Sequence, residues 1–455
     1  MSTAGQHQKT LRQRDLVLFS VSAILLLDTL AAGAVGGPPV IFWWIFFGVV
    51  FFVPMALITA ELGCTFPEQG GIYAWVRDAF GERWSARVTW SYWVNIAVWL
   101  PAIYILFAGI FAQIFAPDMT LGWQIALGIV LSWLTVLVNV VALQVGKWIP
   151  NLGALIKVLI IAVLIVGGFN YGLNHETANE FSMSTMQPRW GDTIQYLPVL
   201  IYGMLGFELV SAGSDEMRNP ARDVPRAILI SGAIIITAYT AATAAILVAI
   251  PAGDINLVEG LMDTLYLLLG DSSLGQTVAL VLGIGALYSF FSNGVTWALG
   301  GNRAIAEAAQ AGEMPAFLGR ESEKNGTPVG AAIWLGISST VILLVYGLLA
   351  GSNEDLFWNL FAFSAVLFLL PYVGMALAFV KLRRMYPGRE RPFRVPGGET
   401  SARLMAWVCV LVLIAAIALF CYVPGEGMLW PVTIGSIVLM AIGEVFIRVQ
   451  ENKRS

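Results

Sequence analysis

The sequence predicts an all-α polytopic membrane protein. Of its 455 residues, 58% are hydrophobic and only 12% are charged, whereas about a quarter of the residues of a soluble protein carry charge. Apolar runs long enough to cross a bilayer, at about 20 residues each, recur along the whole chain. Basic residues gather in alternate connections between these runs, which is the pattern that orients membrane helices.

Twelve transmembrane helices are expected from the apolar runs. We place them at residues 15–34, 38–62, 86–116, 121–144, 149–172, 193–214, 226–250, 273–298, 328–350, 354–380, 404–423 and 429–448. A polar tail, 1–14, precedes the first span, and a short tail, 449–455, follows the last one.

The basic residues give the orientation of these spans. With the N-terminus inside, only Arg189 falls in an outer connection and only Lys157 falls within a span, while every other Lys and Arg lies inside. This bias predicts a multi-pass protein of the plasma (inner) membrane with both termini in the cytoplasm.

The sixth expected span contains features that a plain membrane anchor does not need. Tyr202 is followed by Gly203, Gly206 and Glu208 near the middle of the apolar run. Glycine loosens a helix, and a carboxylate within the bilayer is costly. A helix broken at mid-membrane, as in secondary transporters, accounts for both features. The alternative is a kinked packing helix with a Glu that extends to the interface.

Two further ionisable residues interrupt apolar runs. Asp28 lies in the first span, and we expect it to face a cavity, although it could instead cap a helix fragment in the outer solution. Lys157 lies in the middle of the fifth span, where the carbonyls of a broken helix would accept its hydrogen bonds. Its alternative is to snorkel to the inner interface.

The spacing of the interrupted spans predicts internal symmetry. Spans one and six lie five spans apart, which is the offset of two inverted five-helix repeats that each begin with a broken helix. We therefore divide the chain into a first repeat, 15–172, a second repeat, 193–380, and two peripheral helices in 404–448.

Other classes of protein find little support in the residues. The three cysteines and two histidines have no metal-ligand spacing, and the chain has no zinc-protease motif, nucleophile elbow or phosphate loop. We therefore expect no enzyme activity, no metal, no cofactor and no nucleic-acid partner. A channel would repeat polar residues along several helices, whereas these spans hold isolated polar positions.

Several short motifs resemble those of one membrane protein family. They lie in order along the chain, at Phe66–Tyr73, Ala79–Gly81, Gly206–Glu208, Asp215–Pro225, Asn302–Arg303, Gly312–Pro315 and Gly326–Pro328. From about residue 12 to 448 the chain resembles an amino acid permease of the amino acid–polyamine–organocation superfamily. It most resembles the branch that contains the glutamate–GABA antiporters.

The resemblance implies roles for individual residues. Tyr202 corresponds to an aromatic gate, Trp297 to an aromatic side chain that stacks on substrate, and Ser364 to a polar contact in span ten. Lys157 corresponds to a lysine that replaces a sodium ion in several relatives. Trp297 could instead belong to the interface belt, and Ser364 to helix packing. The sequence departs from the family at 25–29, where Leu-Leu-Leu-Asp-Thr replaces a Gly-Ser-Gly motif that binds the substrate carboxylate.

These observations predict a sodium-independent secondary transporter of amino acids or related amines. It would work by exchange or by proton coupling, with the bilayer and a small-molecule substrate as its partners. A polyamine or diamine transporter is the alternative, and a membrane sensor that does not transport is a remote one. The expected substrate-binding residues are Asp28, Tyr202, Gly203, Gly206, Glu208, Trp297 and Ser364. The expected coupling residues are Lys157, Asp28 and Glu208.

Overall fold

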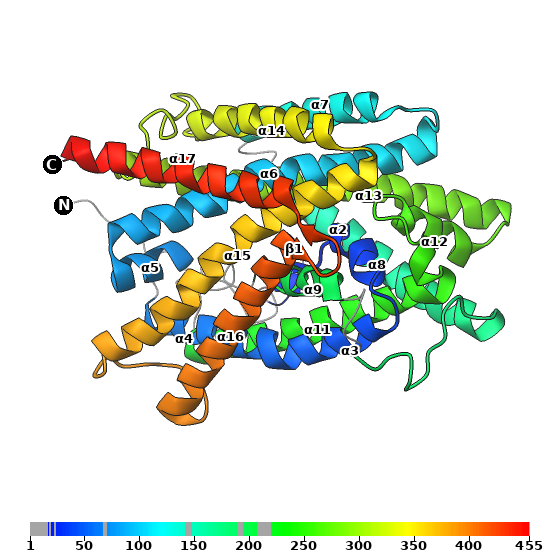
Figure 1. The fold of residues 1–455 in the computed structure, drawn as a ribbon, viewed down its shortest axis with the longest axis horizontal. Coiled ribbons are helices and arrows are strands. Elements are labelled where there is room, and N and C mark those ends of the chain that lie inside the picture. The colour runs from blue at the N-terminus through cyan, green and yellow to red at the C-terminus, as the bar shows by residue number, and fades with distance from the viewer. Residues whose placement is uncertain are drawn as a thin grey trace.

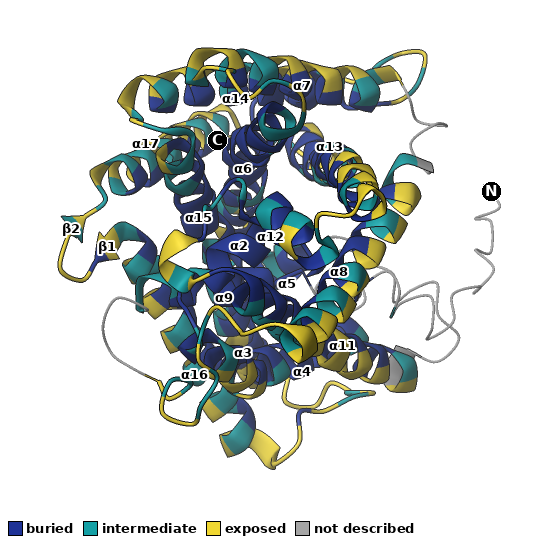
Figure 2. Ribbon diagram, turned by 90° about the vertical axis from the view of Figure 1, so that its right-hand side faces the viewer, coloured by how far each residue is buried: buried dark blue, intermediate teal, exposed yellow. Residues whose placement is uncertain are grey.

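The computed structural model describes residues 17, 20–21, 24–66, 71–141, 148–188, 194–206 and 220–454. Within these ranges, 10 helices are long and apolar enough to cross a membrane. They correspond to the expected spans two to five and seven to twelve. Spans one and six are represented by short helices near the centre of the bundle (Figure 2). The chain is therefore a multi-pass membrane protein.

The elements follow one another along the chain as a nearly continuous series of helices (Figure 1). Their bounds are α2 Asp28–Ala34, α3 Pro39–Phe47, the π-helix η1 Gly48–Phe52, α4 Val53–Thr65, α5 Ile72–Phe80, α6 Glu82–Phe115, α7 Leu121–Val141, α8 Trp148–Asn174, the 3-10 helix η3 Ile194–Tyr196, α9 Leu197–Gly203, α11 Pro220–Ala249, the 3-10 helix η5 Ala252–Asp254, α12 Gly260–Leu269, α13 Ser273–Gln310, α14 Val329–Leu349, α15 Asn353–Met385, α16 Gly398–Cys421 and α17 Trp430–Arg454. The strands β1 Tyr422–Val423 and β2 Gly427–Met428 form a small antiparallel hairpin.

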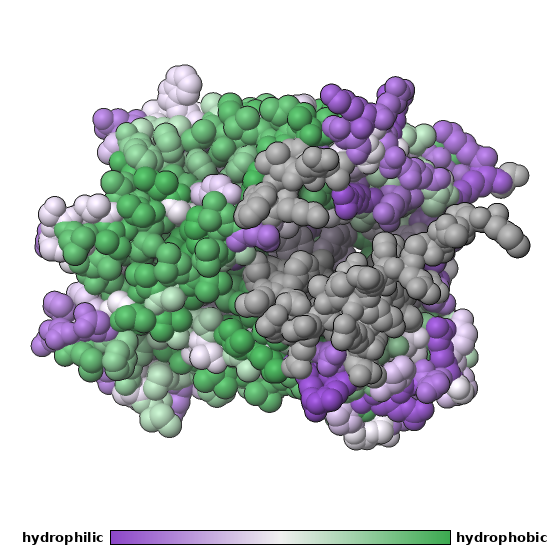
Figure 3. Space-filling view, turned by 180° about the vertical axis from the view of Figure 1, so that it is seen from behind, coloured by the Kyte–Doolittle hydropathy of each residue, from purple (hydrophilic) through white to green (hydrophobic). Residues whose placement is uncertain are grey.

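The helices differ in how deeply they lie in the bundle. Of their most apolar stretches, 89% is buried in α6 and 78% in α15, but only 33% in α16 and 22% in α17. Helices α6 and α15 therefore form the interior with α2 and α9, while α16 and α17 run along the periphery (Figure 1). Seen from behind, hydrophobic side chains cover the broad middle of the molecule and hydrophilic ones lie toward its two ends (Figure 3).

The backbone leaves the helical conformation at both points where an interruption is expected. Leu25, Leu26 and Leu27 are not helical, and α2 begins directly after them at Asp28. Helix α9 ends at Gly203, and the backbone has left the helix before Gly206, whose φ of 113° is readily adopted only by glycine. The first span is therefore interrupted within the described residues, whereas the break in the sixth span stays a prediction because 207–219 lie outside them.

The packing of the helices relates the two halves of the chain. Helix α2 contacts α9, α4 contacts α11, α6 contacts α13 and α7 contacts α14. Each of these pairs joins an expected span of the first repeat to the span five places later. Such pairing is what an inverted repeat would give, and the repeat itself stays a prediction.

Candidate functional site

The interruption in the first span is held by a tyrosine from α11. The Tyr239 hydroxyl donates to the Ile24 carbonyl at 2.8 Å and accepts from the Leu26 amide at 2.8 Å. The Thr29 hydroxyl donates to the Leu26 carbonyl at 3.1 Å. Backbone groups that lose their helical partners inside a membrane must find others. Tyr239 supplies them on both sides of the break.

Trp44 of α3 fixes the position of this tyrosine. Its ring stacks on Tyr239 with centroids 4.6 Å apart and planes at 5°, and its indole nitrogen donates to Thr243 at 3.1 Å. A Cβ atom on Gly203 would lie 3.3 Å from the Trp44 ring and 3.6 Å from Tyr239. Glycine at position 203 therefore lets the end of α9 approach the break in the first span.

Asp28 lies in the first turn of α2 and is almost completely buried, with 3% of its surface exposed. The indole nitrogen of Trp99, on α6, donates to its Oδ2 atom at 3.0 Å. Within the described residues no ion pair reaches Asp28, although the Lys157 ammonium is close enough to act on its charge. The burial of Asp28 contradicts the alternative in which it caps a helix in the outer solution.

Lys157 is equally well buried, with 1% of its surface exposed. Its Nζ atom lies 3.4 Å from Oδ1 of Asn293 on α13. A lysine that snorkels to an interface keeps its ammonium in water, so the burial argues against that reading. Asp28 and Lys157 are thus two oppositely charged groups in the same dry interior.

Aromatic rings connect Asp28 to the other expected site residues. Trp99 lies 6.2 Å from Trp297 between ring centroids, and Trp297 lies 5.7 Å from Phe368. Phe368 in turn lies 5.5 Å from Tyr202. The structure therefore brings Asp28, Tyr202 and Trp297 to one partly apolar cluster, although they come from three distant parts of the chain. This places Trp297 among interior rings rather than in an interface belt.

Ser364 lies beside this cluster on α15. Its hydroxyl donates to the Phe361 carbonyl at 2.8 Å, one turn earlier in the same helix. The residue is fully buried. The hydroxyl proton of Ser364 is therefore used within its own helix, and the expected contact of Ser364 with substrate stays a prediction.

One expected site residue, Glu208, lies in the segment 207–219, outside the described residues. Three residues that the structure places at the site, Tyr239, Trp44 and Trp99, were not expected from the sequence. Aromatic residues are common in apolar spans, so nothing in their sequence context separates them from packing residues.

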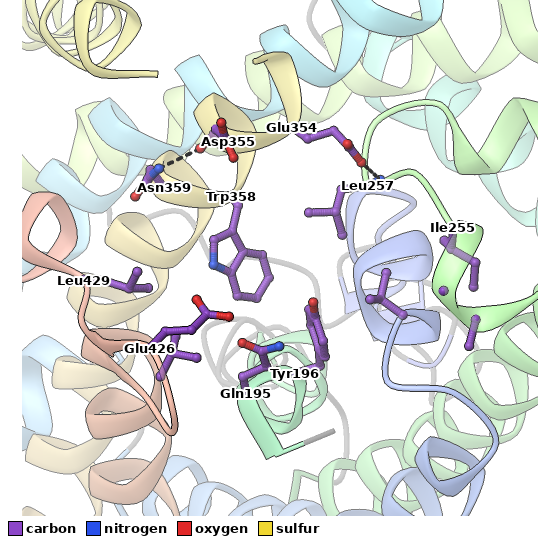
Figure 4. Close-up of a pocket in the computed structure, with 14 residues that line it drawn as sticks. Gln195, Tyr196, Ile255, Leu257, Glu354, Asp355, Trp358, Asn359, Glu426 and Leu429 are labelled. Carbon is purple, nitrogen blue, oxygen red and sulfur yellow. Dashed lines mark hydrogen bonds between the residues drawn. The ribbon is translucent and has the colours of Figure 1, made fainter. Parts of the chain in front are cut away.

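An open cavity of about 630 Å³ lies beyond this cluster (Figure 4). Its lining residues come from the end of α2, the turn before α9, the first turns of α15, the segment after α11 and the β1–β2 hairpin. All of them lie at or beside expected outer connections. Among the residues that the structure describes, its charged lining residues are Glu354, Asp355 and Glu426, and none is basic. The Glu354 carboxylate accepts the Leu257 amide at 2.7 Å.

Aromatic contacts join the cavity to the buried cluster. Tyr196 and Trp358 project into the cavity, with ring centroids 5.6 Å apart (Figure 4). Trp358 lies 6.3 Å from Phe361, and Phe361 lies 4.9 Å from Tyr202. We call this acidic cavity the outer vestibule, after the side of the membrane that the distribution of Lys and Arg predicts for it. Its inner wall leads to Tyr202.

The chain is similar in sequence to known membrane transporters. A family model for amino acid permeases matches residues 11–442. The chain is 33% identical over 440 residues to a probable agmatine/putrescine antiporter of Lactococcus lactis, covering 95% of this chain and 93% of that protein. It is 24% identical over 409 residues to a glutamate/gamma-aminobutyrate antiporter of the same species, covering 81% and 75%.

A third relative is a serine/threonine exchanger of Bacillus subtilis, which is 28% identical over 362 residues, covering 77% of this chain and 76% of that protein. The relatives share a transport function while their names differ in substrate. The family model spans nearly the whole chain, and transport rather than catalysis is what its relatives have in common. The chain therefore belongs to the amino acid permeases of the amino acid–polyamine–organocation superfamily and is a membrane transporter.

Proposed function

We propose that the chain is a sodium-independent secondary transporter that exchanges cationic amines by alternating access. The observation that carries this proposal is Asp28, a carboxylate buried among aromatic rings at the break of the first span. A carboxylate in a dry site needs a cation or a proton. The faces of Trp297 and Tyr202 suit an ammonium or an alkyl chain, at about 1 kcal/mol or more each when desolvated.

The outer vestibule supports a cationic substrate independently of Asp28. Its three carboxylates face no lining cation within the described part of the chain, so they raise the local concentration of positively charged solutes. The name of the relative with 33% identity, an agmatine/putrescine antiporter, also supports an amine. The amine is a diamine or a similar compound with more than one positive charge.

A zwitterionic amino acid is the second candidate. Lys157 acts on the charge of Asp28, and a site in which the two offset each other would favour a substrate without net charge. The relatives named for glutamate, gamma-aminobutyrate, serine and threonine support this candidate. The two candidates differ in which group balances the negative charge of Asp28, the substrate or Lys157.

The coupling mechanism follows from Lys157. A fixed ammonium in the interior repels a sodium ion at short range in a low dielectric, so transport does not need sodium. Transport is driven instead by exchange of substrates, or by coupling to a proton carried by Asp28 or Glu208. Two inverted repeats, 15–172 and 193–380, would move around the breaks in the first and sixth spans. Both termini lie in the cytoplasm, as the distribution of Lys and Arg indicates.

Counterflow into proteoliposomes tests the proposal. Vesicles loaded with putrescine, agmatine, glutamate or serine receive each labelled compound outside, with sodium replaced by choline at constant pH. We expect amine exchange without sodium. Exchange of zwitterions alone would favour the second candidate, and binding without any counterflow would favour a sensor.

Asp28→Asn sharpens the same experiment. The change keeps the size of the side chain and removes its charge, and we expect the affinity for cationic amines to fall by roughly 30-fold, since a hydrogen bond to a charged group contributes about 2 kcal/mol. Affinity for zwitterions should change less, and the pH dependence of uptake should flatten. Equal transport of all substrates by this variant, with an unaltered pH profile, would exclude Asp28 from substrate binding.

A further inference from the structure

A second large cavity lies at the opposite end of the bundle from the vestibule. It has a volume of about 730 Å³ and is formed by the ends of α15 and α16 and the connection between them, at the lower left of Figure 1. Five arginines line it, and Glu399 is the acidic residue among the lining residues that the structure describes. These arginines are Arg383, Arg384, Arg391, Arg394 and Arg403.

A buried carboxylate organises one wall of this cavity. Glu61, at the end of α4, accepts from Nε and Nη2 of Arg383 at 2.8 and 2.5 Å and from Arg391 at 3.3 Å. It also accepts the backbone amide of Val395 at 2.7 Å. The side chains of Glu61 and Arg383 are 1% and 7% exposed. The connection after α15 is therefore fastened to α4, and its arginines are held around the cavity.

The carboxylates present do not balance the arginines. Glu61 shares its charge between Arg383 and Arg391, and Glu399 pairs with Arg383 at 2.8 Å and with Arg403 at 2.9 Å. Arg384 and Arg394 are exposed, and neither has an ion pair in the described part of the chain. Burial lowers the pKa of Arg391, and the charges of Arg383 and Arg394 act in the same direction. Counted over its described residues, the cavity thus holds an excess of positive charge.

The cavity opens beside the surface that faces lipid. Leu404, Trp407 and Leu411 follow Arg403 on α16 and are 64%, 49% and 65% exposed. Exposed apolar residues on a peripheral span face hydrocarbon, and tryptophan favours the level of the headgroups. The arginines therefore lie where the polar groups of a lipid would be.

We propose that this cavity is a binding site for a phosphate group, supplied by the headgroup of an anionic lipid or by a free phosphate. Guanidinium groups donate paired hydrogen bonds that match phosphate oxygens, and Arg384 and Arg394 have those donors available. Basic pockets at the cytoplasmic face of membrane proteins suit such headgroups. The site is independent of the transported substrate, because it lies at the far end of the bundle from the acidic vestibule.

Thermal-shift titration of the purified full-length protein tests this proposal. The probes are dioctanoyl phosphatidylglycerol, dioctanoyl phosphatidylcholine and inorganic phosphate, each added to protein in a neutral detergent. We expect phosphatidylglycerol to raise the melting temperature with a saturating dependence and phosphatidylcholine to leave it unchanged. Saturation by inorganic phosphate at similar concentrations would identify a free phosphate as the source, whereas a response to phosphatidylglycerol alone would identify the lipid.

The double variant Arg384→Gln/Arg394→Gln removes the two arginines without touching the Glu61 network. We expect its apparent affinity for the phosphate probe to fall by about 30-fold, because each basic residue near the membrane surface contributes about 1 kcal/mol. Its melting temperature without ligand reports whether the variant is folded. The control Arg320→Gln/Lys324→Gln makes the same charge change at exposed residues of another inner connection and should bind as the unaltered chain does. Equal binding by both double variants, or no shift with any probe, would overturn the proposal.

Discussion

The two ends of the helix bundle hold cavities of opposite character. The outer vestibule is lined by Glu354, Asp355 and Glu426, with no basic residue among its described lining residues, and two aromatic rings project into it. The inner cavity is lined by five arginines, and its wall is tied together by the buried pair of Glu61 and Arg383. The charge of the acidic end is suited to attract cations, while at the other end Glu61 fastens the connection after α15 to α4. The uneven distribution of Lys and Arg, from which the orientation in the membrane is predicted, also gives the two cavities different chemistry.

The largest difference between the two ends concerns stability. Glu61→Gln leaves the Arg383 guanidinium buried without its counter-charge, and we expect the free energy of unfolding to fall by about 3 kcal/mol or more. Thermal melting of the purified variant measures this. Glu399→Gln is the matched control, because Glu399 pairs with the same Arg383 but is 47% exposed. It should cost less than about 1 kcal/mol. Equal losses in the two variants would show that burial does not set the strength of the inner ion pairs.

The non-helical backbone of the first span, at residues 25–27, is held in place by Tyr239. Tyr239→Phe removes the hydroxyl that serves both the Leu26 amide and the Ile24 carbonyl. Leaving buried polar groups unpaired costs about 1–3 kcal/mol, so we expect lower stability and slower exchange. Tyr288→Phe, whose hydroxyl donates to the Ile149 carbonyl at 3.3 Å in a part-buried position, is the control. If both variants exchange substrate at the same rate, Tyr239 serves packing and not the geometry of the break.

The charge of the vestibule should act on the rate of substrate capture. Asp355→Asn/Glu426→Gln removes two carboxylates that line the cavity, and we expect the initial rate of amine uptake at low ionic strength to fall several-fold. The difference should shrink as salt screens it over about 10 Å at 0.1 M. Glu176→Gln/Glu180→Gln makes the same charge change at exposed residues of another expected outer connection. A loss of uptake that is equal in the two double variants would assign the effect to the overall surface charge.

The smallest expected effect concerns the electrostatic repulsion among the carboxylates of Glu259, Asp263 and Glu354. Burial raises the pKa of Glu259, and repulsion from Asp263 and Glu354 adds to the shift. A carboxyl group with a raised folded-state pKa binds its proton more tightly when folded, so its contribution favours folding at low pH and is lost as pH rises through that pKa. Glu259→Gln should therefore stabilise the protein by a few tenths of a kcal/mol at pH 7, discounted for its partial exposure. The gain should vanish near pH 4, and a gain that is constant with pH would contradict the assignment.

Much of the fold could be predicted from hydropathy, because a bilayer requires long apolar segments with internally satisfied backbones. The ends of the helices were less predictable. Helix α13 continues from its expected end at 298 to Gln310, and α15 continues from 380 to Met385. These turns lie past the apolar run, where the backbone can be helical or solvated at similar cost. Hydropathy therefore locates a span more accurately than it locates the end of its helix.

The candidate site was predicted in part. The position of Asp28 and the glycines 203 and 206 indicated the two breaks, because charge and glycine are out of place in a plain span. Trp297 and Ser364 came from a resemblance, and the structure shows the Ser364 hydroxyl donating to the Phe361 carbonyl of its own helix. The roles of these residues toward a substrate stay predictions. Trp99 and Tyr239 had no signal of their own.

The sequence by itself determined the class of the protein, and it predicted the spans, their orientation and the places where two helices break. These properties depend on composition and on neighbours along the chain, because the bilayer acts on each segment separately. Only the tertiary structure decided which side chains meet. Glu61 and Arg383 are 322 positions apart, and Leu26 and Tyr239 are 213 apart. Contacts over such separations depend on how the finished helices pack, and neither hydropathy nor the local pattern of residues carries that information.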